Sequence, residues 1–94
     1  MTDRVVFKYP LMPNVGPQLF ALPGIDPKVI LVARDPASNT IAVWVEHDHP
    51  DHAIGYVERV FMICATGLLP TAAADGTHVG SVIIDTFVFH VYEV

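Results

Sequence analysis

The chain has 94 residues, of which 52% are hydrophobic and only 16% charged, and its formal net charge is −5. This length accommodates a single domain, 1–94, and the hydrophobic, weakly charged composition excludes an intrinsically disordered chain. The five Lys and Arg residues are scattered singly. Because neutralising phosphates takes clustered cations, we expect neither nucleic acid nor a membrane surface as a partner.

The pattern along the chain is that of strands. Runs rich in Val, Ile and aromatic residues are separated by Pro, Gly, Asp and Asn, which are turn residues. In chain order these runs predict strands at Val5–Tyr9, Gln18–Leu22, Val29–Ala33, Thr40–Glu46, Tyr56–Ala65, His78–Ile84 and Phe87–Tyr92. Pro10 is expected to end the first strand, and 35–39 and Asp85-Thr86 are expected to form turns.

We therefore expect an all-β, mainly antiparallel domain with little helix. Thr71–Ala74 is a helix candidate, but it is too short to be stable alone. About seven short strands in one small domain suggest a small barrel or a two-sheet sandwich. The runs 29–33 and 41–45 are apolar on both faces, which a domain of this size cannot fully bury. A homo-oligomer is therefore expected, because exposed apolar patches usually mark interfaces.

The single cysteine, Cys64, excludes a fold held together by disulfide bonds. The first residues lack the basic start and the apolar run of a signal peptide, and the longest nearly apolar stretch, 81–94, is too short to span a bilayer. We therefore expect a cytoplasmic protein.

Three of the five histidines lie in one short segment. His47, His49, Asp51 and His52 form the pattern H-x-H-x-D-H, and imidazole and carboxylate are ligands that zinc prefers. The pattern resembles the metal-binding signature of the metallo-β-lactamase superfamily, which implies bound zinc and an activated water. That superfamily has a far longer chain with further ligands downstream, so a metal-dependent hydrolase is not expected. Zinc binding stays open beside the favoured alternative, a solvated polar loop.

Five other residues are candidates for a ligand site. An ammonium or guanidinium group would meet an anion, and an aromatic ring would stack on a ligand; the candidates are Lys8, Tyr9, Trp44, Arg59 and Tyr92. The structural alternatives are favoured: a half-buried Tyr9 with its hydroxyl at the surface, and Trp44 in the core. Cys64 lies among apolar residues, and no serine occupies a nucleophile elbow, so we expect no enzyme.

Several motifs follow one another along the chain: Lys8-Tyr9-Pro10-Leu11 near the start, a central Trp44, Thr66-Gly67 after a strand, and the end Phe89-His90-Val91-Tyr92-Glu93. In this order they resemble a family of short tailed-bacteriophage proteins of about this length. The resemblance implies a phage accessory protein in the cytoplasm of the infected host, with no assigned activity.

Together these observations favour a non-enzymatic, oligomeric binding protein that acts on a host component. The alternatives are a protein that binds or sequesters a small, nucleotide-like molecule, a metal-binding protein that uses the segment His47–His52, and a component of the virion. No cofactor other than zinc is suggested by the sequence.

Overall fold

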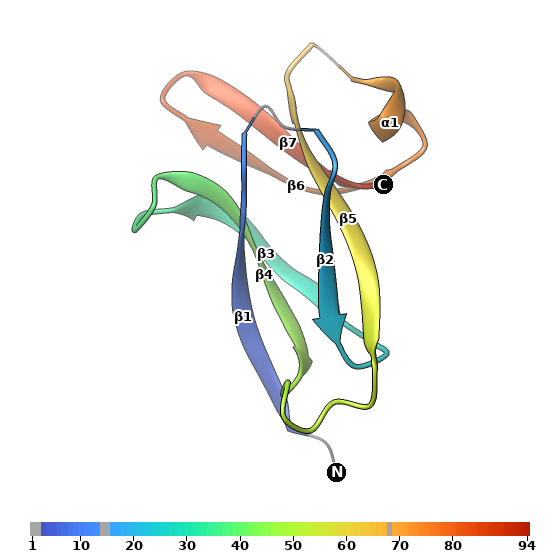
Figure 1. Ribbon diagram of the computed structural model, residues 1–94. Helices are drawn as coiled ribbons and strands as arrows, with labels where there is room; N and C mark the ends of the chain where they lie inside the picture. Colours follow the sequence, from blue (N-terminus) through green and yellow to red (C-terminus); the bar gives the residue numbers. More distant parts are fainter. Residues whose placement is uncertain (1–2, 14–15, 68) are drawn as a thin grey trace.

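The computed structural model describes residues 3–13, 16–67 and 69–94. These residues form seven strands and one short helix (Figure 1). The elements in chain order are β1 (Arg4–Leu11), β2 (Gln18–Pro23), β3 (Lys28–Asp35), β4 (Thr40–Asp48), β5 (Tyr56–Ala65), α1 (Thr71–Ala74), β6 (Thr77–Ile84) and β7 (Phe87–Glu93). The predicted all-β class and all seven predicted strands are confirmed, and most strands extend by one or two residues beyond the predicted ends.

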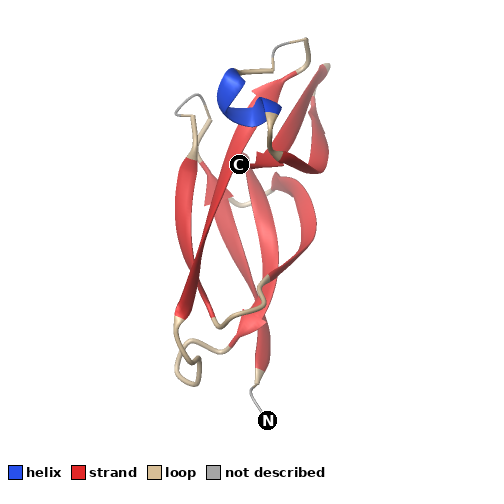
Figure 2. Ribbon diagram, turned by 90° about the vertical axis from the view of Figure 1, so that its right-hand side faces the viewer, coloured by secondary structure: helices blue, strands red, loops and turns tan. Residues whose placement is uncertain are grey.

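The strands form two antiparallel sheets. The three-stranded sheet has the order β1-β4-β3, and the four-stranded sheet has the order β2-β5-β7-β6. Of the two predicted architectures the structure is therefore the two-sheet sandwich and not a closed barrel. Figure 2 shows the short helix α1 near the C-terminus, towards the end of the molecule opposite the N-terminus.

The core lies between the two sheets. Alternate residues of β4, namely Ile41, Val43 and Val45, pack with Phe61 of β5 and Val91 of β7 in one buried cluster. Successive side chains of a strand point to opposite faces, so this alternation assigns one face of β4 to the core. Burying each of these side chains contributes roughly 1.5–3 kcal/mol of stability.

The prediction that Pro10 ends the first strand is wrong. β1 continues to Leu11, with Pro10 opposite Ala42 and Leu11 opposite Ile41. β1 is an edge strand, where proline is tolerated because its missing N–H can fall on the unpaired side. Continuation of β1 brings Leu11 into the buried cluster.

The predicted turn between β3 and β4 is confirmed, and buried Asp35 organises it. The Asp35 carboxylate accepts hydrogen bonds from the Ala37 N–H (3.1 Å) and the Ser38 hydroxyl (2.7 Å), and Lys8 Nζ lies 2.8 Å away. The hydrogen bond from Lys8, followed by that from Ser38, lowers the pKa of Asp35 below its ordinary value. The turn is thereby tied to the neighbouring edge strand β1.

Candidate functional site

The structure places His47 inside the sandwich and not in the loop that follows β4. Its side chain is fully buried, because β4 continues to Asp48 and His47 falls on the same face as Val45. His47 Nδ1 lies 2.7 Å from the Asp48 carbonyl, which only accepts, so Nδ1 carries the proton and donates. Nε2 then accepts from the Tyr9 hydroxyl, 2.6 Å away. Both ring nitrogens are occupied, which leaves neither available to a metal ion.

The other three predicted metal ligands lie in the loop after β4. The rings of His49 and His52 are 5.1 Å apart, and Asp51 Oδ2 lies 3.8 Å from His49 Nδ1. Among residues 3–13, 16–67 and 69–94, no three His, Cys, Asp or Glu side chains are grouped so as to hold a metal ion. The predicted set of four is therefore not brought together, because strand alternation turns His47 away from the loop.

The five predicted ligand-binding residues are also dispersed. Register places Lys8 opposite Trp44 on the outer face of the three-stranded sheet, whereas Tyr9 and Arg59 face the space between the sheets. Tyr92 lies on the outer face of the four-stranded sheet, opposite Met62 and His78. The five residues therefore lie in three separate parts of the fold: the two outer sheet faces and the space between the sheets. They do not form one site.

Both cations of that set are already paired with carboxylates. Lys8 contacts Asp35, and the Arg59 guanidinium binds Glu93 and donates to the Pro27 carbonyl at 3.1 Å. The hydrogen bond from Arg59 to Glu93 is the main cause of the raised pKa of Arg59. In this conformation neither cation is free to meet a phosphate.

Two structural interpretations of aromatic residues need correction. Trp44 is not in the core: it alternates with the core residues Val43 and Val45 and faces outward, partly exposed. The Tyr9 hydroxyl is not at the surface, since it donates to buried His47. Burial is the main cause of the raised pKa of Tyr9, with a smaller contribution from the charge of Tyr56.

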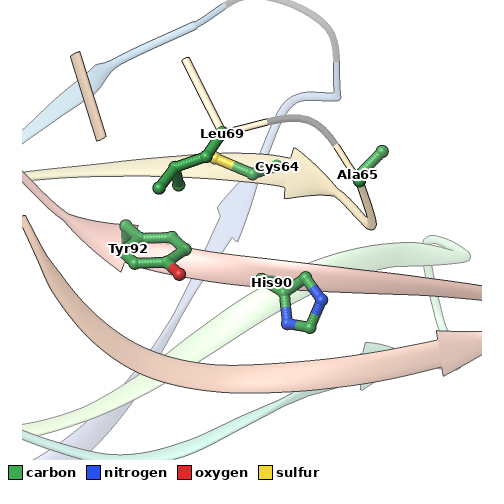
Figure 3. Close-up of a pocket in the computed structure, with 6 residues that line it drawn as sticks. Cys64, Ala65, Leu69, His90 and Tyr92 are labelled. Carbon is green, nitrogen blue, oxygen red and sulfur yellow. The ribbon is translucent and has the colours of Figure 1, made fainter. Parts of the chain in front are cut away.

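A pocket of about 280 Å³ lies on the outer face of the four-stranded sheet, beside the turn that follows β5 (Figure 3). Cys64 on β5 and His90 and Tyr92 on the neighbouring strand β7 supply its chemically distinctive side chains. Ala65, Gly67 and Leu69 complete the lining. We define these residues as the β5–β7 pocket.

The Cys64 thiol at this pocket is a weak candidate for a nucleophile. Cys64 is buried and packs with Met62, Ala73 of α1 and Tyr92. Burial raises the pKa of the Cys64 thiol, so little of it is in the reactive thiolate form at neutral pH. This agrees with the structural role expected from its apolar sequence neighbours.

A row of polar side chains borders the β5–β7 pocket, and sequence analysis missed most of it. His90 lies within hydrogen-bond distance of Thr66 and Ser81, and Ser81 also contacts His78. The sequence did contain a signal for the contact between Ser81 and His90. A two-residue turn at 85–86 places these two residues opposite each other when residues are counted back from the turn. His78 joins the row only because the register shifts between His78 and Gly80, which sequence counting does not predict.

A second notable surface is the end of the sandwich that lies lowest in Figure 1. Ile25 and Ile54 are 83% and 85% exposed there, and Tyr56 is 59% exposed. Their loops are joined by a hydrogen bond from the Gly24 N–H to the Gly55 carbonyl, 2.9 Å long. Both glycines have positive φ, of 88° and 80°, a conformation that other residues rarely adopt. We call Ile25, Ile54 and Tyr56 the isoleucine end.

Comparison with known proteins identifies the family. The family model described as "Domain of unknown function (DUF7352)" matches residues 2–94, so the chain belongs to that family. No curated protein and no solved structure matches it significantly. Across the part of the chain that the structure describes, no helix has the length and apolar character needed to cross a membrane.

Proposed function

We propose that this member of the DUF7352 family is a non-enzymatic accessory protein of a tailed bacteriophage that binds a host protein in the cytoplasm of the infected cell. The observation that carries the proposal is the isoleucine end, where two isoleucines are more than four-fifths exposed. The phage origin rests on the motif resemblance. We also propose that the protein catalyses no reaction, because the predicted site residues are dispersed over the fold and do not form one active site.

The isoleucine end has the properties of a binding anchor. Burying an exposed isoleucine in a partner's pocket releases roughly 1.5–3 kcal/mol, and a few such anchors supply most of the affinity of an interface. The Gly24–Gly55 hydrogen bond holds the two loops together before binding. Less conformational entropy is then lost when the complex forms.

The charges near these anchors indicate the kind of partner. Asp26 follows Ile25 in one loop, Asp51 shares the other loop with Ile54, and both aspartates are exposed. The whole chain also carries a net charge of −5. Exposed Lys28 and Arg4 lie near Asp26, and Arg4 donates to its carbonyl at 2.9 Å, so the preference for a host pocket flanked by Lys or Arg rests mainly on the net charge of the chain.

We also propose that the chain forms a homo-oligomer through the outer face of the three-stranded sheet. Trp44 lies there between Lys8 on β1 and Leu31 on β3. Val6 and Leu31 are each about half exposed on the same face. Large apolar side chains gathered on one outer sheet face are typical of a surface that pairs with a second copy.

A second candidate function is binding of a small molecule in the β5–β7 pocket. The pocket's Tyr92 and His90 rings offer surfaces for an aromatic ring, such as the base of a nucleotide-like molecule. The described residues that line the pocket include no Lys or Arg, so the base and not a phosphate would be the recognised part. Native mass spectra of untagged protein test this candidate: a retained mass that is lost in the Tyr92→Ala variant supports it, and a bare protein contradicts it.

Co-purification from host cells tests the main proposal. The variant Ile25→Ser/Ile54→Ser removes both anchors, and Ile83→Ser removes an isoleucine that is 71% exposed on β6. We expect wild type and Ile83→Ser to retain one host protein in constant stoichiometry and the double variant to lose it. The complex should form again from the two purified proteins. If all three forms retain the same proteins, or if none retains a partner, the proposal is wrong.

A further inference from the structure

Four side chains beside the β5–β7 pocket form a continuous row of hydrogen bonds. His78 Nε2 lies 2.9 Å from Ser81 Oγ, and Ser81 Oγ lies 2.7 Å from His90 Nδ1. His90 Nε2 lies 3.2 Å from Thr66 Oγ1, which is 2.9 Å from the Val88 carbonyl oxygen. Ser81 is exposed on the edge strand β6, so a reagent in solution can reach its hydroxyl.

The Val88 carbonyl sets the direction of every hydrogen bond in the row. A carbonyl only accepts, so the Thr66 hydroxyl donates to it, and Thr66 Oγ1 then accepts from His90 Nε2–H. Neutral His90 therefore keeps its lone pair on Nδ1, where the Ser81 hydroxyl donates. Ser81 Oγ in turn accepts from His78 Nε2–H.

This arrangement has the signature of an activated hydroxyl: a hydroxyl donates to an imidazole, and a third group fixes the tautomer of that imidazole. We propose that Ser81 is a covalent acylation site that accepts short acyl groups from activated esters. His90 acts as the base, and Thr66 is a positioning residue that acts through His90. This inference is independent of the proposed binding to a host protein.

The chemical step balances without a further reactant. Ser81 Oγ attacks the ester carbonyl carbon while its proton passes to His90 Nδ1, so an Oγ–C bond forms. The bond from that carbon to the leaving oxygen then breaks, and the proton on His90 neutralises the leaving group. The products are an ester on Ser81 and a free alcohol or phenol.

The neighbouring pocket fits an acyl group of limited size. His90 belongs both to the row and to the β5–β7 pocket, whose volume is about 280 Å³. Cys64, Leu69 and Tyr92 contribute apolar atoms to its lining, beside the polar atoms of His90 and Tyr92. Ser81 does not itself line the pocket, so a short acyl group on Ser81, such as acetyl, would lie next to the pocket across His90.

Ser38, the one other serine in the chain, provides an internal control. Its hydroxyl donates to the Asp35 carboxylate at 2.7 Å and contacts Thr40 Oγ1 at 2.7 Å. Interactions with Lys8 and Ser38 lower the pKa of Asp35, so this carboxylate is a weaker base than an imidazole. Ser38 should therefore react far more slowly than Ser81.

Acetylation by p-nitrophenyl acetate, mapped by peptide mass spectrometry, tests the proposal. We expect Ser81 to be acetylated at least about tenfold faster than Ser38. His90→Gln should slow acetylation of Ser81 on the order of a hundredfold, the typical contribution of a general base. Circular dichroism of each variant establishes that it is folded.

Thr66→Val tests the positioning role in a variant of nearly unchanged shape. It should shift the proton of His90 from Nε2 towards Nδ1, visible in the imidazole ¹⁵N NMR signals, and slow acetylation of Ser81 several-fold while Ser38 is unaffected. Equal acetylation of Ser81 and Ser38 in the wild type would overturn the proposal. So would a rate at Ser81 that His90→Gln leaves unchanged.

Discussion

Tyr9 and His47 form a polar contact inside an otherwise apolar sandwich. The contact satisfies both groups, because the Asp48 carbonyl fixes the proton on His47 Nδ1 and leaves Nε2 to accept from Tyr9. A buried acceptor that loses its donor carries the full cost of having left water. The pair therefore links edge strand β1 to the central strand β4 through a specific, directional interaction.

We predict that Tyr9→Phe lowers the free energy of unfolding by about 1–3 kcal/mol, because it leaves His47 Nε2 buried without a donor. Urea unfolding at neutral pH measures the change. Tyr56→Phe is the matched control: Tyr56 is 59% exposed, and its loss of a hydroxyl should cost at most about 0.5 kcal/mol. Equal costs for the two variants would show that the buried hydrogen bond contributes nothing specific.

His47 and Trp44 were misplaced by sequence analysis for the same reason. His47 and Trp44 both lie on β4, where every residue from Ile41 to Val45 is apolar, so hydropathy does not reveal which face is buried. The flanking strands β1 and β3 decide it, and their pairing with β4 is a long-range property. Once Val43 and Val45 face inward, alternation alone places Trp44 outside and His47 inside.

At the scale of elements, the turn between β3 and β4 is tied to β1 by the ion pair of Lys8 and Asp35. The pKa of Asp35 lies below its ordinary value in the folded protein, chiefly through Lys8. The resulting stabilisation is therefore fully present above the pKa of the unfolded chain. It is lost as the pH falls through the lower pKa of the folded protein.

We predict that Lys8→Met destabilises the protein at about pH 6 and that its difference from wild type shrinks at lower pH. The decline should begin below about pH 4, where Asp35 starts to bind a proton in the unfolded chain. Urea unfolding of both proteins across this range measures it. A difference that stays constant down to about pH 2 would contradict the assignment to Asp35.

The register shift between His78 and Gly80 is a bulge in β6, and it shapes both the packing of the sheets and the row of hydrogen bonds. Gly80 lies where β6 approaches β3 of the opposite sheet: a Cβ at Gly80 would lie 2.6 Å from the Val32 Cβ, far closer than packing allows. The glycine thus permits close contact between the sheets. The same irregularity turns His78 to the face of Ser81, so it also builds the row of hydrogen bonds.

We predict that Gly80→Ala costs about 1–3 kcal/mol of stability, the usual cost of overpacking a core. Val32→Gly removes both the Cβ and the methyl groups that obstruct the new Cβ, so the two substitutions together should cost less than the sum of their separate effects. Urea unfolding of the two single variants and the double variant measures this coupling. Strict additivity would mean that Gly80 does not limit the distance between the sheets.

The strands themselves were the part of the fold that the sequence predicted most accurately. All seven strands were predicted because the runs of β-branched and aromatic residues are separated by turn residues. The two-residue turn at 85–86 even implied that Ser81 faces His90. The bulge was not predictable, because a glycine within a strand is compatible with a regular strand as well as with a register shift.

At the scale of the whole molecule, the choice between barrel and sandwich depends on pairs of strands that are distant in sequence. β1 pairs with β4, β2 with β5, and β5 with β7, so only the β3–β4 and β6–β7 hairpins are local. A run of apolar residues predicts a strand but does not say which distant strand pairs with it. The isoleucine end could not be predicted from the sequence for the same reason. It consists of two loops about thirty residues apart in the chain, which are joined by the Gly24–Gly55 hydrogen bond.

We propose above that the isoleucine end anchors a host protein. The most direct test is calorimetric titration of the purified host partner into wild type, Ile25→Ala and Ile83→Ala. We predict that Ile25→Ala weakens binding at least about fivefold, since losing a buried anchor costs more than about 1 kcal/mol, and that Ile83→Ala binds like wild type. Equal affinities for the three proteins would contradict the account.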